Sequence, residues 1–322
     1  MKARAGLLLG ALVATAAAIA PAIPANAALT TSCVGEAGAV TVPGDLVVPA
    51  GKSCVLDGTT VEGKVTVRSG ADLVVTNGTF KTTVVVQANG YLDLTDTTVV
   101  GKITSQGGYG TYTSGSSFAA YNETGAGDLT PFLYAEGATI GGNVTAKAGE
   151  VYVSGSTAKN ITTTDSSYTD VLNSTLTGNL SVTNAAFGSQ VCASEFDGNG
   201  IFEGNAGVQL GSGALFGECV GGSNYFGKNV TINNSSVGVE VNGNIIRGNL
   251  AGEGNDPAPI GTDNRVRGEQ TGQFADLSAA AARSLARRSA PADHGAEIKA
   301  KIADRKAEAT NEAAAAGRAA IG

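Results

Sequence analysis

The sequence is short of the residues on which most enzyme chemistry depends. Its 322 residues include one histidine, one methionine and no tryptophan, and charged residues make up only 15%, against about 25% in an ordinary globular protein. The single histidine, His294, lies close to the C-terminus. Catalytic Ser-His-Asp and Cys-His arrangements and histidine metal centres are therefore excluded from the body of the chain, as are the tryptophan platforms that stack on sugars.

Positive charge is also scarce in the body of the chain. The formal net charge is −7, the segment 278–322 carries +3 and residues 1–27 carry +2, so the body at 28–277 carries −12. A body of this sign repels nucleic acid and anionic lipid, whose binding needs clusters of Lys and Arg. We therefore expect no nucleic-acid partner.

Residues 1–27 have the pattern of a secretory signal peptide. Lys2 and Arg4 precede an apolar run, and the small residues Ala-Asn-Ala follow at 25–27, which predicts export and removal of this segment. The run is shorter than the about 20 apolar residues that a bilayer requires, and no second apolar run follows, so no membrane span is expected. The predicted localisation is secreted, either extracellular or associated with the cell envelope.

The body is a repeat with a period near 19 residues. Val65, Val84 and Ile103 follow one another at this spacing, each after a short Gly-, Lys- or Thr-containing turn. Three short Val- and Thr-rich strands with three Gly- or Asn-rich turns in each period are typical of one coil of a β-solenoid. Other steps of 17 and 41 residues do not fit the strict hexapeptide repeat of a left-handed helix. We predict an all-β, right-handed parallel β-helix domain of about twelve coils over 28–277.

The abundant glycine and asparagine fit the same architecture. Gly, present 46 times, suits the turns that need positive φ. Asn side chains at one turn of successive coils can hydrogen-bond along the stack. We expect such a ladder, structural rather than ligand-binding, from Asn143, Asn160, Asn179, Asn229 and Asn244.

Four cysteines in an exported chain indicate disulfides, with three pairings open. Proximity in the sequence favours Cys33 with Cys54 and Cys192 with Cys219. No Cys-x-x-Cys is present, so neither a redox motif nor a zinc knuckle is expected.

Carboxylates are the remaining candidates for chemistry. Asp197, Asn199 and Glu203 could present oxygens to Ca²⁺, but their spacing does not match an EF-hand loop. Asp93 with Asp96, and Asp165 with Asp170, could form acid pairs for glycoside hydrolysis. Acids so close in sequence on a solenoid usually mark a solvated turn, so we assign no catalytic, cofactor or metal residue.

One segment breaks the repeat, because 41 residues separate Ile103 from Val144. We expect a long loop at 106–130 that projects from the scaffold, where binding residues tend to lie. Its candidate ligand-contact residues are aromatic, and they could instead cover an apolar flank of the solenoid: Tyr109, Tyr112, Phe118 and Tyr121.

The composition changes abruptly at residue 278. The tail at 278–322 is rich in Ala, Arg, Lys and Glu, which favour helix, but it has no continuous apolar stripe. Pro291 and Gly295 divide it. We expect a solvated extension, helical in part or disordered, and a monomeric protein.

The stretch from Asn242 to Leu250 and the Asn-Asp-Pro that follows at 255–257 resemble a family of secreted, Gly/Asn-rich right-handed β-helix proteins of actinobacteria. That pattern usually has two cysteines where this chain has Gly252 and Phe274. The resemblance implies the fold rather than an activity.

Two functions of different class follow. The first is a non-enzymatic extracellular or cell-envelope scaffold that binds a polysaccharide or a cell-surface partner. The alternative is a polysaccharide lyase or glycoside hydrolase that acts in a groove on one face of the β-helix, through carboxylates or through Arg247, Arg265 or Arg267. The polygalacturonase pattern needs a Gly-His-Gly that this chain lacks, so the non-enzymatic function is favoured.

Overall fold

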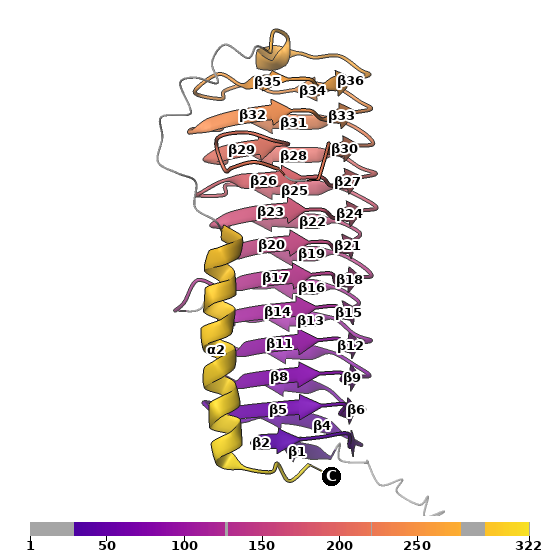
Figure 1. Ribbon diagram of the computed structural model, residues 1–322, viewed down its shortest axis with the longest axis vertical. Helices are drawn as coiled ribbons and strands as arrows, with labels where there is room; N and C mark the ends of the chain where they lie inside the picture. Colours follow the sequence, from indigo (N-terminus) through magenta and orange to yellow (C-terminus); the bar gives the residue numbers. More distant parts are fainter. Residues whose placement is uncertain (1–28, 126–127, 220, 278–293, 322) are drawn as a thin grey trace, which may run out of the picture.

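The protein is a parallel β-solenoid with one α-helix packed along its side (Figure 1). The computed structural model describes residues 29–125, 128–219, 221–277 and 294–321. The segment predicted as a signal peptide lies outside the described residues. Within these ranges, short strands stack into three parallel sheets of twelve strands, one strand per sheet from each coil, with about 19 residues per turn. The predicted all-β parallel solenoid of about twelve turns is thus confirmed.

Each sheet takes every third strand of the chain. Sheet A is built from β1 (Thr30–Ser32), β4 (Asp45–Val48), β7 (Val65–Val67), β10 (Val84–Val86), β13 (Ile103–Ser105), β16 (Tyr121–Glu123), β19 (Val144–Ala146), β22 (Ile161–Thr164), β25 (Leu180–Thr183), β28 (Gly200–Glu203), β31 (Val230–Asn233) and β34 (Leu250–Ala251). Sheet B is built from β2 (Gly35–Ala37), β5 (Ser53–Asp57), β8 (Asp72–Thr76), β11 (Tyr91–Thr95), β14 (Gly110–Ser114), β17 (Phe132–Glu136), β20 (Glu150–Ser154), β23 (Tyr168–Leu172), β26 (Ser189–Cys192), β29 (Gly207–Leu210), β32 (Gly238–Asn242) and β35 (Ile260–Thr262). Sheet C has shorter strands: β3 (Thr41–Val42), β6 (Thr60–Val61), β9 (Thr79–Phe80), β12 (Thr98–Val99), β15 (Ser117–Phe118), β18 (Thr139–Ile140), β21 (Thr157–Ala158), β24 (Thr175–Leu176), β27 (Glu195–Phe196), β30 (Tyr225–Phe226), β33 (Ile245–Ile246) and β36 (Arg265–Val266).

The register is set by the aliphatic positions of the repeat. Val65, Val84 and Ile103 are direct partners on neighbouring strands of sheet A, and all three are completely buried. Because side chains alternate between the two faces of a strand, each inward position becomes a column that fills the narrow interior, and each outward position becomes a column on the surface.

The segment predicted as a projecting loop is a regular coil, so that prediction is wrong. It contributes β14, β15 and β16, and Tyr121 is aligned between Ile103 and Val144 in the inward column. An aromatic residue at a position otherwise aliphatic hid this coil in the sequence. Phe118 and Tyr121 are buried in the interior, whereas Tyr109 and Tyr112 lie on the outer side of sheet B.

The predicted asparagine ladder is present. Asn160 Nδ2 donates to Asn143 Oδ1 at 2.9 Å, and the backbone N–H of Asn179 donates to Asn160 Oδ1 at 2.7 Å. The ladder continues through two residues that the prediction left out and one that it included: Asn199, Asn229 and Asn249.

Asn244 belongs to a second, buried ladder rather than to the exposed one, which corrects its assignment. Its Oδ1 accepts from Asn224 Nδ2 at 2.9 Å, and its Nδ2 donates to Asn264 Oδ1 at 3.0 Å. In earlier coils serine hydroxyls take this place, since Ser174 Oγ accepts from the backbone N–H of Ser156 at 3.1 Å. The ladder thus satisfies buried backbone groups in most coils, as a dry interior requires, and the coils with Gly78 and Ala138 at this position lack its polar side chain.

Both ends of the solenoid are covered. At the C-terminal end the short 3₁₀ helix η1 (Gly272–Phe274) places Phe274 in the core, against Gly252, where an added Cβ would lie only 2.9 Å from the ring. At the other end, residues 317–321 pair with β2: Glu36 N–H donates to Gly317 O at 2.9 Å, and Ala319 N–H donates to Glu36 O at 2.8 Å.

The tail is helical in its described part, as expected, but it packs on the solenoid and is not solvated, which corrects that part of the prediction. Residues from His294 to Ala316 form the continuous helix α2, which lies along sheet B from β23 down to β2 (Figure 1). Its buried side chains are His294, Ile298, Ile302, Ala309 and Ala313. Four of the five are apolar and four to seven residues apart, so they form a sparse stripe that is not continuous in the sequence.

The two expected disulfides are both present, Cys33–Cys54 and Cys192–Cys219. Cys33 and Cys54 are fully buried and join β2's coil to the next one. Two disulfides indicate an oxidising environment. No helix in the part of the chain that the structure describes is long and apolar enough to cross a bilayer.

Replacing Cys33 and Cys54 by Ala should lower the melting temperature. The bond closes a loop of 21 residues, which corresponds to about 3 kcal/mol in the chain-entropy model and to roughly 6–12 °C for a domain of this size. Circular dichroism melting of the oxidised protein measures the shift. An unchanged melting curve would contradict a stabilising role for this bond.

Candidate functional site

Sheet B has an outer face unlike that of an ordinary solenoid, which is lined by small polar residues. Its two outward columns carry acids and aromatics under α2: in one column Asp72, Tyr91, Phe132, Glu150 and Tyr168, and in the other Asp93, Tyr112, Tyr134, Tyr152 and Asp170. We call this surface, from β8 to β23, the acidic-aromatic face. The strand register alone places these side chains side by side.

The four carboxylates form two equivalent diagonal pairs. Asp72 lies one strand before Asp93 and is offset by two residues, because Val74 is the direct partner of Asp93. Glu150 and Asp170 repeat this arrangement on β20 and β23, where Tyr152 is the direct partner of Asp170. Most aromatic side chains of the face lie between the two pairs, and Tyr168 lies on the same strand as Asp170.

Each of these carboxylates meets one cation of α2. Arg305 contacts Asp72 at 2.9 Å, and Lys306 contacts Asp93 at 3.0 Å. Lys301 contacts both oxygens of Glu150 at 2.7 Å.

The fourth carboxylate meets the only histidine. His294 Nδ1 lies 2.8 Å from Asp170 Oδ2, and its ring stacks on Tyr168 with centroids 3.8 Å apart. Asp170 therefore also lies at the N-terminus of α2, where the helix dipole favours an anion.

Aromatic rings complete the contact with α2. Ile298 and Ile302 pack among Tyr91, Phe132 and Tyr134, and the Arg305 guanidinium lies 5.4 Å from the Tyr109 ring. Two of the four predicted ligand-contact residues, Tyr109 and Tyr112, thus belong to this covered face. Tyr112 donates a hydrogen bond to Glu136 at 3.2 Å.

Burial controls the protonation of this face. It raises the pKa of Asp72 to about 6, although the Arg305 guanidinium opposes the shift. It also raises the pKa of Asp170, against the hydrogen bond and charge of His294. For His294, burial alone would lower the pKa, but the hydrogen bond and charge of Asp170 raise it above the ordinary value of 6.5.

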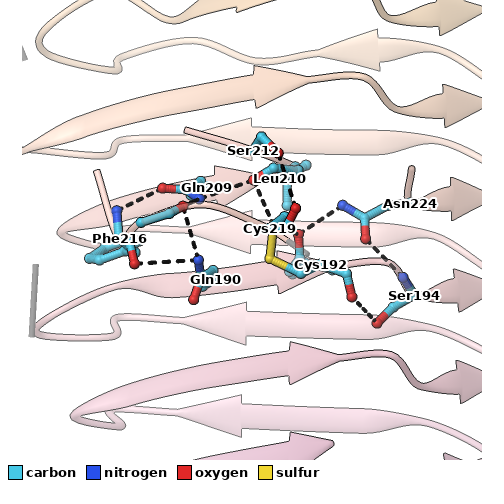
Figure 2. The surroundings of a disulfide bond; sticks show 12 residues. Gln190, Cys192, Ser194, Gln209, Leu210, Ser212, Phe216, Cys219 and Asn224 are labelled. Atoms are coloured by element: carbon cyan, nitrogen blue, oxygen red, sulfur yellow. Dashed lines mark hydrogen bonds between the residues drawn. A yellow bond between two sulfur atoms is a disulfide. The ribbon is translucent and has the colours of Figure 1, made fainter. Parts of the chain in front are cut away.

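Beyond α2, a loop covers the upper part of sheet B. Figure 2 shows how the Cys192–Cys219 disulfide ties Gly211–Cys219 down onto β26 and β29. Gln209 Nε2 donates to the Gly217 carbonyl at 2.6 Å, and Gln209 Oε1 accepts from the backbone N–H of Phe216 at 2.6 Å. The Phe216 ring in turn lies 6.2 Å from that of His294, so the loop meets the start of α2.

The acid pairs that the sequence offered, but to which no catalytic role was assigned, are not brought together. Asp93 and Asp170 lie under α2, whereas Asp96 and Asp165 sit at turns with φ of 48° and 54°. The structure instead pairs acids on neighbouring strands, a relation that depends on register and that neighbours in sequence could not reveal.

Two of the residues considered as Ca²⁺ ligands instead form hydrogen bonds between neighbouring coils. Asn199 belongs to the asparagine ladder, and Glu203 accepts hydrogen bonds from Asn233 and Asn234. In the described ranges no three His, Cys, Asp or Glu side chains form a group that could hold a metal ion. The sequence left Ca²⁺ binding open without assigning a metal residue, and these contacts add no support for it.

Sheet C presents a different surface, open to solvent. The outward residue of each two-residue strand from β3 to β24 carries a hydroxyl, and neighbouring members are direct strand partners. This hydroxyl column consists of Thr41, Thr60, Thr79, Thr98, Ser117, Thr139, Thr157 and Thr175. At about 4.8 Å per strand it extends over about 33 Å. Beyond β24 the column changes to Glu195 and Tyr225.

No protein-family model, curated protein or solved structure matches the chain. We therefore infer function from the two surfaces themselves.

Lys306→Gln should loosen α2, because it leaves Asp93 fully buried without its cation. Breaking a buried pair costs several kcal/mol, and since Lys306 is itself 38% exposed we expect about 1–3 kcal/mol. Hydrogen exchange of the α2 amides measures the loss of protection. Lys299→Gln is the matched control: its pair with Glu136 is exposed and 3.6 Å long, so it should change protection by less than about 0.5 kcal/mol. Equal effects of the two variants would contradict a stabilising role for the buried Lys306–Asp93 ion pair.

Docking of α2 should weaken as the pH rises. Asp72 and His294 both have raised pKa values, so the docked state binds protons that the unfolded chain releases, and stability falls with pH. The contribution of Asp72 to stability is lost between pH 3.8 and about pH 6. The contribution of His294 is lost above pH 6.5. The His294 side chain faces Asp170, Tyr168, Glu150 and Glu297.

Amide protection factors of α2, corrected for intrinsic exchange, follow this change with pH. His294→Gln keeps a hydrogen-bond donor but does not titrate, so it should abolish only the step above pH 6.5. If the variant retained that step, the assignment to His294 would be wrong.

Proposed function

We propose that the protein is a non-enzymatic binding scaffold of the extracellular space or the cell envelope, and that the hydroxyl column of sheet C binds an extended polysaccharide. The observation that carries this proposal is the uninterrupted run of eight hydroxyl side chains in register on a rigid, exposed sheet. Each hydroxyl both donates and accepts hydrogen bonds, as does each hydroxyl of a sugar chain.

The scaffold supplies what individual hydroxyl groups lack. A single hydroxyl contact in water contributes little free energy, but a row of contacts with a constant spacing can add up along one polymer. The stacked strands fix the positions of all eight hydroxyl side chains before binding. The protein therefore loses little conformational entropy when it binds a polymer. The export signal predicted at 1–27 and the two disulfides support an extracellular location.

The diagonal acid pairs favour a second candidate, a polysaccharide-degrading enzyme. Neighbouring strands and a two-residue offset place the Cα atoms of Asp72 and Asp93 about 8 Å apart, and glycosidase carboxyl groups lie about 5–9.5 Å apart. All four carboxylates are, however, covered by α2 and paired with its cations. The non-enzymatic function therefore accounts better for the closed molecule.

Thr98→Lys with Thr139→Lys should weaken binding at least tenfold, a change of about 1.4 kcal/mol, because the long side chains hold a polymer away from the column. Pull-down with insoluble plant and bacterial polysaccharides measures the affinity. The matched control is Thr66→Lys with Thr145→Lys, two outward threonines of sheet A, which should bind as the parent does. Equal loss in both variants would contradict sheet C as the binding face.

The same incubations distinguish the two candidates. Mass spectrometry of the soluble fraction should find no shortened saccharides. Reproducible cleavage that Asp93→Asn abolishes would replace the scaffold function by the enzymatic one.

A further inference from the structure

We propose that the acidic-aromatic face of sheet B also accepts the α2 helix of a second copy of the chain, so that two copies assemble by exchanging their helices. The closed chain, in which α2 covers its own face, corresponds to the monomer expected from the sequence. In the exchanged dimer each helix makes the same contacts with the other copy.

Charge complementarity defines the occupant of this face. Four carboxylates at fixed positions on four strands meet four cations spread over thirteen residues of one helix, from His294 to Lys306. A shift of α2 by about one strand would move each cation beside a position of its column that holds no carboxylate. The face therefore selects a segment with the spacing of α2, and a second copy carries that segment by construction.

The interface is held more by charge than by apolar burial. Ile298 and Ile302 are the only large aliphatic side chains that α2 buries, and its other buried apolar residues are Ala309 and Ala313. Water can solvate the acids, phenols and cations when the two surfaces separate. Polar interfaces of this kind resemble those between domains that move relative to each other, and salt weakens them.

The connection to the solenoid is long enough for exchange. Sixteen residues separate Leu277 from His294, and an extended chain of that length spans up to about 55 Å. The solenoid rises only four coils from β23 to β35, which is about 19 Å. The chain length therefore does not restrict α2 to its own solenoid.

The end of the chain adds a second contact. Residues 317–321 pair with β2, the edge strand of sheet B, and bury Ala319 and Ile321 against the core. Edge strands accept a strand from any chain that presents one, so this contact can form between copies as well. Reciprocal exchange then gives a closed twofold dimer, which holds two hydroxyl columns together.

A test uses the wild-type chain in two isotopic forms. Unlabelled and ¹⁵N-labelled protein are mixed in equal amounts at millimolar concentration, which is near the effective concentration of a tethered segment, then incubated in high salt and returned to low salt. A zero-length carbodiimide then links Lys301 to Glu150, whose atoms are 2.7 Å apart. Mass spectrometry reads the labels of the two linked peptides.

Exchange predicts a mixed-label Lys301–Glu150 product, rising toward about half of all such products if every helix has been exchanged between closed dimers. Light scattering of the same sample should show a species of twice the monomer mass. Lys301→Gln removes the reacting amine and must abolish the product. Same-label products alone, no product at all, or a dimer without mixed-label links would each overturn the proposal.

Discussion

Register between successive coils is the constraint on which the rest of this molecule depends. Once Val65, Val84 and Ile103 are stacked as direct partners, every other position of the repeat is assigned to an inward or outward column. The buried ladder of serine and asparagine side chains then supplies hydrogen bonds that a dry interior needs in most coils. The hydroxyl column and the paired acids are consequences of this stacking, because residues about 20 positions apart in sequence become neighbours in space.

The two main surfaces use the same backbone for opposite purposes. On sheet C hydroxyl side chains face outward from β3 to β24, and no described segment lies over them. On sheet B the outward positions hold bulky phenols and acids, which a solenoid exposes only at a cost in free energy and solubility. Helix α2 and the Gly211–Cys219 loop cover that sheet almost from end to end, with charge matched to charge. The molecule thus has one open face and one that its own chain occupies.

Much of the fold could be read from the sequence, because the 19-residue spacing and the aliphatic positions repeat locally. The disulfides could be read because each pair is close along the chain. One coil could not be recognised in the sequence, because Tyr121 occupies a position that is aliphatic in the neighbouring coils. Docking of α2 could not be predicted, because Asp72, Asp93, Glu150 and Asp170 belong to different coils and show their pattern only when stacked. His294 is the one residue of the tail that could have indicated docking. A histidine that is buried needs a hydrogen-bond partner, and here Asp170 supplies it.

The contact between residues 317–321 and β2 has a mechanical consequence. It fastens the last residues of the chain to the first coil, so a pull on the C-terminus does not load the solenoid at once. The strand pair at β2 yields first, and α2 then peels upward, losing Lys306 and Arg305 from their carboxylates before Lys301 and finally His294. Tension is thus dissipated in small successive steps along the side of the molecule, while the stacked coils keep their shape.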